Sequence, residues 1–219
     1  MRPRLSCLRT PMTPSLNLQE WFGSIDIYLF DQLLKGRFIP GMRVLDAGCG
    51  SGRNLVYFLR SGYEVFGVDG STEAISQTRQ LAAAIAPHLP PDNFRVEEVE
   101  QMSFADARFD VVLSSAVLHF ARDEEQWQAM INEMWRVLKS GGIFFARLAS
   151  SIGIEDQVRV IEGRRHRLPD GSDRFLVDEA MLLSASAALG AEFIEPIKTV
   201  IVQHMRAMTT WCVRKKAGN

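Results

Sequence analysis

The sequence predicts an α/β protein with a doubly wound, mostly parallel sheet of seven strands and an antiparallel strand pair at its C-terminal end. Short apolar runs alternate with longer amphipathic stretches between residues 43 and 148. The apolar runs are nearly continuous, as in parallel strands that are buried on both faces. Because crossover connections between parallel strands are right-handed, this alternation favours a doubly wound sheet.

The first predicted element is a helix near the N-terminus. Prolines at positions 3, 11 and 14 indicate that residues 1–16 form a flexible arm. From Asn17 onward apolar residues recur every four positions, which is typical of a helix that Asn17 caps and Gly36 ends. We expect residues 17–219 to form a single domain.

The alternating region then predicts five strands and three helices. The strands are expected at residues 43–47, 63–69, 94–97, 109–115 and 143–148, and the helices at 52–61, 71–86 and 123–139. This core of the domain, residues 40–148, holds most of the predicted sheet.

The alternation stops after Leu148. Residues 149–174 are polar and include the basic cluster Arg164–Arg167. A helix is expected at 178–189, followed by β-rich runs at 192–194 and 199–213. Since no crossover-length spacer separates these two runs, we expect them to pair antiparallel.

Composition narrows the class of partner. The 219 residues include 25 basic and 26 acidic side chains, a net charge of −1, which argues against nucleic acid or an anionic membrane as partners. No apolar stretch approaches the ~18 residues of a spanning helix, and the N-terminus has no apolar signal-peptide region. Three unpatterned cysteines argue against disulfides and against a zinc or other metal site. We therefore expect a cytoplasmic protein.

The most informative stretch is a glycine-rich turn after the first predicted strand. Gly48, Gly50 and Gly52 alternate directly after Asp46 and precede a helix. Glycines permit positive φ and close approach of a ligand, and a helix N-terminus offers free N–H groups. Asp69 ends the next strand, where an acid can bind both hydroxyls of a ribose. Together these features predict a nucleoside-containing ligand.

A nicotinamide dinucleotide is the first alternative, but two residues oppose it. In the pyrophosphate-binding pattern G-x-G-x-x-G, read from Gly48, the last glycine would stand at Arg53. Asp46 also places a negative charge at the turn, which suits a cationic ligand better than a pyrophosphate.

The order of motifs resembles that of class I S-adenosylmethionine-dependent methyltransferases. Residues 46–52, DAGCGSG, look like their first motif, and residues 68–71, VDGS, are similar to their second. Residues 102–112 look like their "LPF…FDVV" passage, and residues 136–142 resemble the turn before their fifth strand. The resemblance covers residues 40–148 and implies a Rossmann-like fold. A shorter likeness, in residues 52–54 and 62–63, is to tellurite-resistance methyltransferases.

The resemblance implies S-adenosylmethionine as cofactor and assigns residues to it. Gly48 and Gly50 would give room to its methionine end, and Asp46 would lie near its ammonium group. The remaining implied contacts are the ribose hydroxyls at Asp69, the adenosine beside Gly70 and Ser71, the adenine at Glu98 and the Val99 N–H, and the sulfonium beside Ser114. Where the family usually has an aspartate, this chain has Glu98.

Methyl transfer from a sulfonium is an in-line displacement, which positioning alone accelerates strongly. A general base is needed only for a protonated acceptor. His119 follows the fourth strand and is the catalytic candidate, able to orient or deprotonate an acceptor; a structural hydrogen bond is its alternative role.

Other residues near the predicted site have less specific roles. Trp21 and Tyr28 are candidates to cover the cofactor, although core packing fits Trp21 better. Arg147 and the cluster Arg164–Arg167 are candidates to bind an anionic acceptor, and Cys49 is expected to serve packing.

Three functional hypotheses follow. The leading one is methyl transfer to a small molecule, since neither an Asn/Asp-Pro-Pro-aromatic nor a Pro-Cys signature of nucleic-acid or protein amide methyltransferases is present. The second is a non-catalytic, cofactor-binding regulatory or partner subunit, and the third a nicotinamide enzyme. The sequence specifies neither the acceptor atom nor the oligomeric state.

Overall fold

The computed structural model describes residues 17–217, so the predicted arm at residues 1–16 lies outside the described residues. The strands are β1 (Arg43–Ala47), β2 (Glu64–Asp69), β3 (Phe94–Val96), β4 (Phe109–Ser115), β5 (Leu138–Ser150), β6 (Arg159–Glu162), β7 (Arg165–Arg167), β8 (Asp173–Phe175), β9 (Ala191–Phe193), β10 (Lys198–Val202) and β11 (Arg206–Lys215). The main sheet has the order β10-β11-β5-β4-β1-β2-β3, with β9 paired to β11. The predicted doubly wound, mostly parallel class is confirmed.

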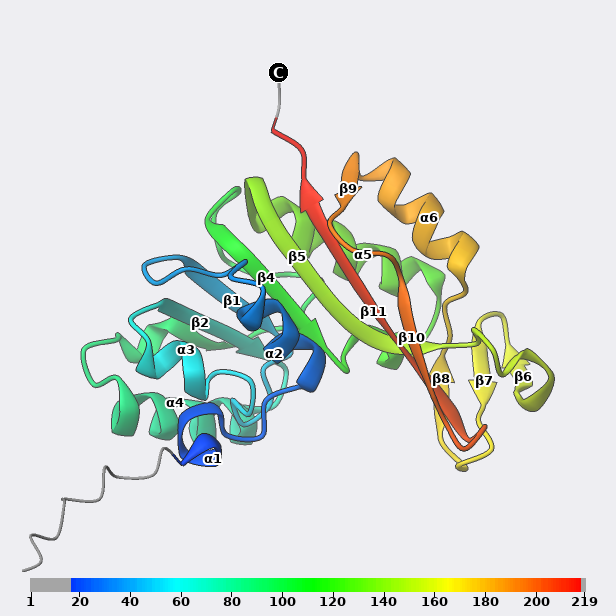
Figure 1. The fold of residues 1–219 in the computed structure, drawn as a ribbon, viewed down its shortest axis with the longest axis horizontal. Coiled ribbons are helices and arrows are strands. Elements are labelled where there is room, and N and C mark those ends of the chain that lie inside the picture. Colours follow the sequence, from blue (N-terminus) through cyan, green and yellow to red (C-terminus); the bar gives the residue numbers. More distant parts are fainter. Residues whose placement is uncertain (1–16, 218–219) are drawn as a thin grey trace, which may run out of the picture.

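Helices cover both faces of this sheet (Figure 1). They are α1 (Leu18–Phe22), α2 (Ile27–Leu34), α3 (Val56–Arg60), α4 (Thr72–Ile85), α5 (Glu124–Val137) and α6 (Glu179–Ala188). Apolar side chains of α2, α3 and α4 pack on one face, and those of α5 and α6 pack on the other. Among the described residues, no helix is long and apolar enough to cross a membrane.

The strands supply side chains to both cores by alternation. In β1, Val44 belongs to the core under α3 and α4, whereas Leu45 belongs to the core under α5. β1 pairs parallel with β2 on one side and with β4 on the other. Successive connections therefore leave β1 in opposite directions, and a crevice forms at the carboxyl ends of β1 and β4.

The main sheet has eight strands because the run 199–213 folds back on itself. Gln203 and His204 both have positive φ, and the Met205 N–H donates to the Val202 carbonyl. This is the geometry of a two-residue hairpin turn, for which Asn-Gly is the usual sequence. The Gln-His pair carries no such pattern. β9 pairs antiparallel with β11, as predicted for the two C-terminal runs.

The sequence predicts one continuous N-terminal helix, and this prediction is wrong, because the structure has the two short helices α1 and α2 there. Asn17 caps α1 as expected, accepting a hydrogen bond from the Glu20 N–H. Gly23 then has φ +59°, and a Cβ there would lie 2.8 Å from Val56 Cγ2, so the chain turns where it approaches α3. Asp26 starts α2 by accepting from the Tyr28 and Leu29 N–H groups.

The polar segment after Leu148 forms a second, three-stranded sheet of β6, β7 and β8, which projects beyond the main sheet (Figure 1). Leu168 and Leu176 of this segment pack with Ala149 and Met208 of the main sheet. The segment is therefore held beside the crevice, and we call residues 151–177 the insertion.

Candidate active site

Gly48 and Gly50 shape the turn after β1 in different ways. Gly48 has φ +82°, and a Cβ there would lie 2.4 Å from Val117 Cγ2, so no larger residue fits. Gly50 has φ +53°, and a Cβ there would meet nothing within 4 Å. Gly48 therefore allows the Val117 side chain to pack closely against the turn. At Gly50 no other residue covers the backbone, so a ligand can approach it.

Asp69 ties this turn to the end of β2. Its Oδ2 accepts a hydrogen bond of 2.9 Å from the Gly50 N–H, and its Oδ1 accepts one of 2.9 Å from the Ser71 N–H. A carboxylate has about four acceptor positions, so two backbone donors leave capacity for a further pair of donors such as ribose hydroxyls. Ser71 itself caps α4 through its side chain.

Two hollows meet at Asp69. The turn pocket, about 440 Å³, is lined by the glycine turn together with Arg53, Asn54 and residues 115–117. The β3-side pocket, about 350 Å³, is lined by Gly70, Glu98, Val99 and Met130, among others. Both pockets include Gly48, Asp69, Val117 and Phe120, so Asp69 stands at their junction.

Asp46 lies in β1 beneath the turn and is buried. Neither of its carboxylate oxygens has a hydrogen-bond partner within residues 17–217. Burial raises the pKa of Asp46 to about 7, against the attraction of the Arg53 charge and with a smaller contribution from Asp69. A buried carboxylate without a partner is costly, so it favours a cationic group nearby. The buried Ser114 hydroxyl at the end of β4 also has no partner among the described residues.

A third hollow, the acceptor pocket, adjoins the turn pocket. It measures about 410 Å³ and is lined by Asp26, Arg53, Ala116, His119, Phe120, Arg147, Ala149, Leu168, Asp170, Ser172, Arg174, Arg206 and Met208. Arg53, Ala116 and Phe120 line both this pocket and the turn pocket. Ala116 has φ +64°, a strained conformation for a residue with a side chain. Such strain tends to occur at functional sites.

His119 lines the acceptor pocket, and its imidazole ring is uncharged near neutral pH. Its Nδ1 accepts a hydrogen bond of 3.2 Å from the Ala149 N–H, which places the ring hydrogen on Nε2. Burial, together with the Arg174 charge, lowers the pKa of His119 to about 4. Near neutral pH this side chain can therefore donate a hydrogen bond from Nε2, whereas its one basic nitrogen is already occupied.

One wall of the acceptor pocket comes from the start of α2. Asp26 Oδ2 forms an ion pair of 2.7 Å with Arg147, whose guanidinium lies 4.6 Å from the centre of the Tyr28 ring. The other oxygen of Asp26 caps α2. Asp26 and Arg147 thus form an ion pair inside the pocket wall, while the buried Arg147 Nε has no partner among the described residues.

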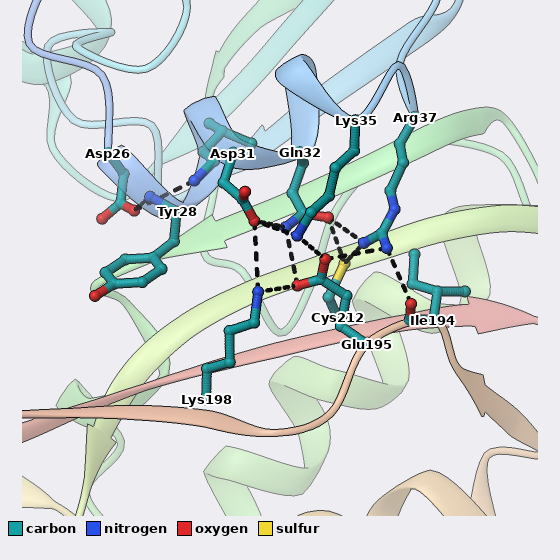
Figure 2. A network of polar contacts seen from close by, with 11 residues as sticks. Asp26, Tyr28, Asp31, Gln32, Lys35, Arg37, Ile194, Glu195, Lys198 and Cys212 are labelled. Atoms are coloured by element: carbon teal, nitrogen blue, oxygen red, sulfur yellow. Dashed lines mark hydrogen bonds and ion pairs between the residues drawn. The ribbon is translucent and has the colours of Figure 1, made fainter.

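The buried carboxylate of Glu195, between β9 and β10, connects helix α2 to the C-terminal strands (Figure 2). Glu195 pairs with Lys35, with Lys198 at 2.8 Å and with Arg37 at 3.0 Å, and it accepts a hydrogen bond from Gln32. Although burial alone would raise it, the pKa of Glu195 falls to about 2 because Lys198, Lys35 and Gln32 donate to the carboxylate. This network fixes the helix that carries Asp26.

The residues present fit a nucleoside ligand with a cationic tail. Gly50, with its open face, and Asp69, with its free acceptor capacity, line the turn pocket, and Asp46, which has no partner among residues 17–217, is buried beneath the turn. Residues 45–146 match the family described as methyltransferase domain. These residues form a methyltransferase domain. The domain runs from β1 into β5 and holds the whole glycine turn.

Curated relatives share this methyltransferase domain. An uncharacterised methyltransferase of Synechocystis sp. is 35% identical over 105 residues, which cover 48% of this chain and 46% of the relative. A malonyl-acyl-carrier-protein O-methyltransferase of Enterobacter lignolyticus is 32% identical over 154 residues, covering 69% and 55%. An arsenite methyltransferase of Aquipseudomonas alcaligenes is 28% identical over 140 residues, covering 58% and 38%. The chain thus spans about half the length of the curated relatives it matches.

Solved structures share the fold of the methyltransferase domain. A SAM-dependent methyltransferase of Methanosarcina mazei has a TM-score of 0.68 at 21% identity, covering 85% of this chain and 98% of that one. The Burkholderia thailandensis 1,6-didemethyltoxoflavin-N1-methyltransferase has 0.67 at 19%, covering 91% and 81%. The cyclase SpnF also has 0.67, at 18%, covering 86% and 80%. Because a cyclase shares the fold, the fold alone does not specify the reaction, and the pockets have to distinguish the possible reactions.

The methyltransferase fold brings most of the predicted cofactor residues together. The members that line the two cofactor-side pockets are Gly48, Gly50, Asp69, Gly70, Glu98 and Val99. Asp46 and Ser114 lie buried at the adjoining strand ends, and Ser71 lies on the surface as a helix cap. Their contacts with the cofactor stay predictions.

Two of the candidate features outside the cofactor side, Trp21 and the cluster Arg164–Arg167, do not line the cofactor-side or acceptor pockets. Trp21 neither joins the core nor lines a cofactor-side or acceptor pocket, because α1 contributes no buried residue and Trp21 is 39% exposed. In the cluster Arg164–Arg167, Arg164 pairs with Glu124 and Asp178, and Arg167 pairs with Asp173. None of the four residues of this cluster lines the acceptor pocket. Cys49 packs under the turn as expected, where a Cβ at Gly67 would meet its sulfur.

The sequence did not identify several residues of the acceptor pocket. Asp26, Arg174 and Arg206 come from segments far apart in the chain, and no spacing connects them, whereas Ala116 and Phe120 lie in one segment with His119. Phe120 is 62% exposed although it lines all three pockets, and only its position beside His119 could have indicated it.

Proposed function

We propose that the protein transfers a methyl group from S-adenosylmethionine to a small-molecule acceptor by in-line displacement. The observation that carries this proposal is the acceptor pocket, which adjoins the turn pocket through Arg53, Ala116 and Phe120. A donor site that opens into a second site is what group transfer between two small molecules needs. Residues 17–219 would then form one methyltransferase domain.

Each side chain has a stated task in this proposal. Asp69 would bind the ribose hydroxyls, with Gly70 and Ser71 beside the adenosine, and Glu98 and the Val99 N–H would bind the adenine. Gly48 and Gly50 would make room for the methionine end, Asp46 would attract its ammonium, and Ser114 would lie beside the sulfonium. When bound, the cofactor supplies an electrophilic methyl group.

On the acceptor side, the chain contributes position rather than a base. His119 would donate a hydrogen bond from Nε2 to the acceptor, because Nδ1 is occupied by the Ala149 N–H. Ala116 and Phe120, which line both pockets, would flank the point where the acceptor atom meets the methyl group; the acceptor–methyl bond forms there as the sulfur–methyl bond breaks. Aligning two bound reactants in this way is worth up to ~7–11 kcal/mol of the barrier.

The non-catalytic alternative lacks a supporting observation. A subunit that only binds the cofactor has no use for a second pocket beside it, whereas the acceptor pocket here is about as large as the turn pocket. The cytoplasmic location, and the absence of nucleic-acid or membrane partners, stay predictions from the sequence.

The test is a methyl-transfer assay with labelled S-adenosylmethionine and a panel of small metabolites. We expect label in at least one compound, and we expect Asp69→Ala to abolish the transfer. Glu73→Ala is the matched control, because Glu73 is an exposed acid on α4 that lines none of the three pockets. Cofactor binding with no transfer to any acceptor class would favour the non-catalytic subunit instead.

A further inference from the structure

The acceptor pocket carries an excess of positive charge. Arg53, Arg147, Arg174 and Arg206 line it, against two carboxylates, Asp26 and Asp170. His119 adds no charge near neutral pH, because burial and the Arg174 charge lower its pKa to about 4. These arginines come from separate parts of the chain, so the excess is a property of the folded pocket.

Some of the charged side chains in the acceptor pocket, such as Arg147 and Asp170, have hydrogen-bond or ion-pair partners within the protein. Arg147 is paired with Asp26 at 2.7 Å and is thereby neutralised within the wall. Asp170 accepts hydrogen bonds from the N–H and the hydroxyl of Ser172, at 3.0 and 2.6 Å. Those bonds, together with the charges of Arg206 and Arg174, lower the pKa of Asp170, so it is ionised near neutral pH.

Three of the four guanidinium groups have no carboxylate partner among residues 17–217. One of them, Arg53, donates to the Ser115 hydroxyl at 3.4 Å and also lines the turn pocket, so Arg174 and Arg206 are the two that belong to the acceptor pocket alone. Arg174 donates to the Asp173 backbone carbonyl and lies 4.9 Å from the centre of the Phe120 ring. The Arg206 guanidinium makes no hydrogen bond or ion pair with any other residue between 17 and 217, although it is close enough to Asp170 for the two charges to interact. Both therefore present unused donors toward the same pocket. Guanidinium donors of this kind bind carboxylate or phosphate oxygens in pairs.

The two arginines also have a defined place relative to the cofactor side. Arg174 and Arg206 line the acceptor pocket and are absent from the turn pocket, whereas Arg53, Ala116 and Phe120 line both. The acceptor pocket thus adjoins the predicted methyl-donor site at Arg53, Ala116 and Phe120. The Arg174 guanidinium lies over the Phe120 ring, and Arg206 contributes a second positive charge that is absent from the turn pocket. Arg174 belongs to the insertion and Arg206 to the C-terminal hairpin, which both lie outside the cofactor-binding core.

We propose that the acceptor is a small organic anion whose carboxylate or phosphate group binds Arg174 and Arg206 while its methyl-accepting atom faces Ala116. This substrate class rests on the proposed methyl transfer. In this arrangement the methyltransferase core supplies the donor site, and the insertion and hairpin select the acceptor.

The first test is equilibrium binding by calorimetry on the full chain, with and without S-adenosylhomocysteine. The probes are malonate, inorganic phosphate and, as an uncharged control, malonamide. We expect malonate or phosphate to bind and malonamide not to bind, and the stronger of the two anions identifies the group. Arg174→Gln and Arg206→Gln should each weaken binding about 10-fold, since a charged hydrogen bond contributes roughly 1.5–3 kcal/mol.

Arg214→Gln is the matched control, because Arg214 is an exposed arginine on β11, like Arg206, but lines none of the three pockets. Binding of neither anion, or anion binding unchanged in the Arg174→Gln, Arg206→Gln double variant, would overturn the proposal. If the wild type does not bind S-adenosylhomocysteine, the proposed function is contradicted. Anion binding is also measured without S-adenosylhomocysteine, so failure of the proposed function and failure of the anion proposal are distinguishable.

The second test uses the methyl-transfer assay. Acids should be methylated in preference to their amides, and Arg206→Gln should raise KM about 10-fold with kcat nearly unchanged, because the anionic group is held away from the reacting atoms. Equal methylation of acids and amides would overturn the proposal.

Discussion

At the scale of single residues, Asp46 combines complete burial with unsatisfied oxygens. Its pKa of about 7 lies above its ordinary value, so the folded state holds an extra proton at acid pH. The stability it contributes is present at low pH and is lost as the pH rises through about 7. Asp46→Asn should therefore stabilise the ligand-free protein by about 4 kcal/mol at about pH 8 and by less than half of that at about pH 5, as measured by urea unfolding.

The same residue should make cofactor binding pH-dependent. An ammonium group favours the ionised carboxylate, so wild-type affinity for S-adenosylhomocysteine should rise between about pH 6 and about pH 8. In Asp46→Asn the affinity should be lower and nearly independent of pH over that range. Equal affinities of the two proteins at about pH 8 would remove Asp46 from the site.

For His119 the predicted pH dependence of stability is opposite to that for Asp46. Its folded pKa of about 4 lies below its ordinary value, so the stability it contributes is present above about pH 6.5 and is lost as the pH falls toward 4. His119→Gln should remove that acid sensitivity in thermal unfolding, and it should retain more activity than His119→Ala because an amide can both accept and donate. An activity profile with a pKa near 6.5 that disappears in His119→Gln would show instead that His119 acts as a base.

At the scale of elements, the attachment of α2 to the C-terminal strands is testable through Glu195. Its folded pKa of about 2 lies below its ordinary value, so its stabilisation is present above about pH 4.5 and is lost as the pH falls through 2. Glu195→Gln should lower the free energy of unfolding at pH 7 by about 2 kcal/mol, a value reduced for the solvent screening of its partly exposed lysine partners.

Glu192→Gln is the control for that measurement, because Glu192 is an exposed acid on β9 outside the network. Equal urea midpoints for Glu195→Gln, Glu192→Gln and the wild type would contradict the structural role of the network. Since α2 carries Asp26, Glu195→Gln should also raise the KM for the acceptor.

Elements differ in how well the sequence predicts them. The strands of the parallel core were predictable because a buried strand needs a continuous apolar run, which local sequence displays. The break at Gly23 and the Gln203-His204 turn were not, because each depends on a tertiary contact or on a backbone conformation that these residue types rarely adopt. The strands of the insertion are too short and polar to show a period.

At the scale of the whole molecule, the cofactor side was predictable and the acceptor side was not. The cofactor side uses a contiguous turn and one acid at the end of the next strand, so spacing alone relates Gly50 to Asp69. The acceptor pocket is assembled from α2, the end of β4, β5, the insertion and the C-terminal hairpin. Arg174 and Arg206 became candidates only when the fold placed them in one pocket.

The proposed cofactor site is centred on the junction of the two cofactor-side pockets, and titration calorimetry with S-adenosylhomocysteine measures binding there most directly. We expect micromolar binding to the wild type and to Glu73→Ala, no binding of NAD, and loss of binding in Asp69→Ala. Glu98→Ala, which leaves the Asp69 hydrogen bonds to the turn intact, should weaken binding about 10-fold. Unchanged affinity in folded Asp69→Ala and Glu98→Ala, or equal binding of NAD, would contradict the cofactor site described above.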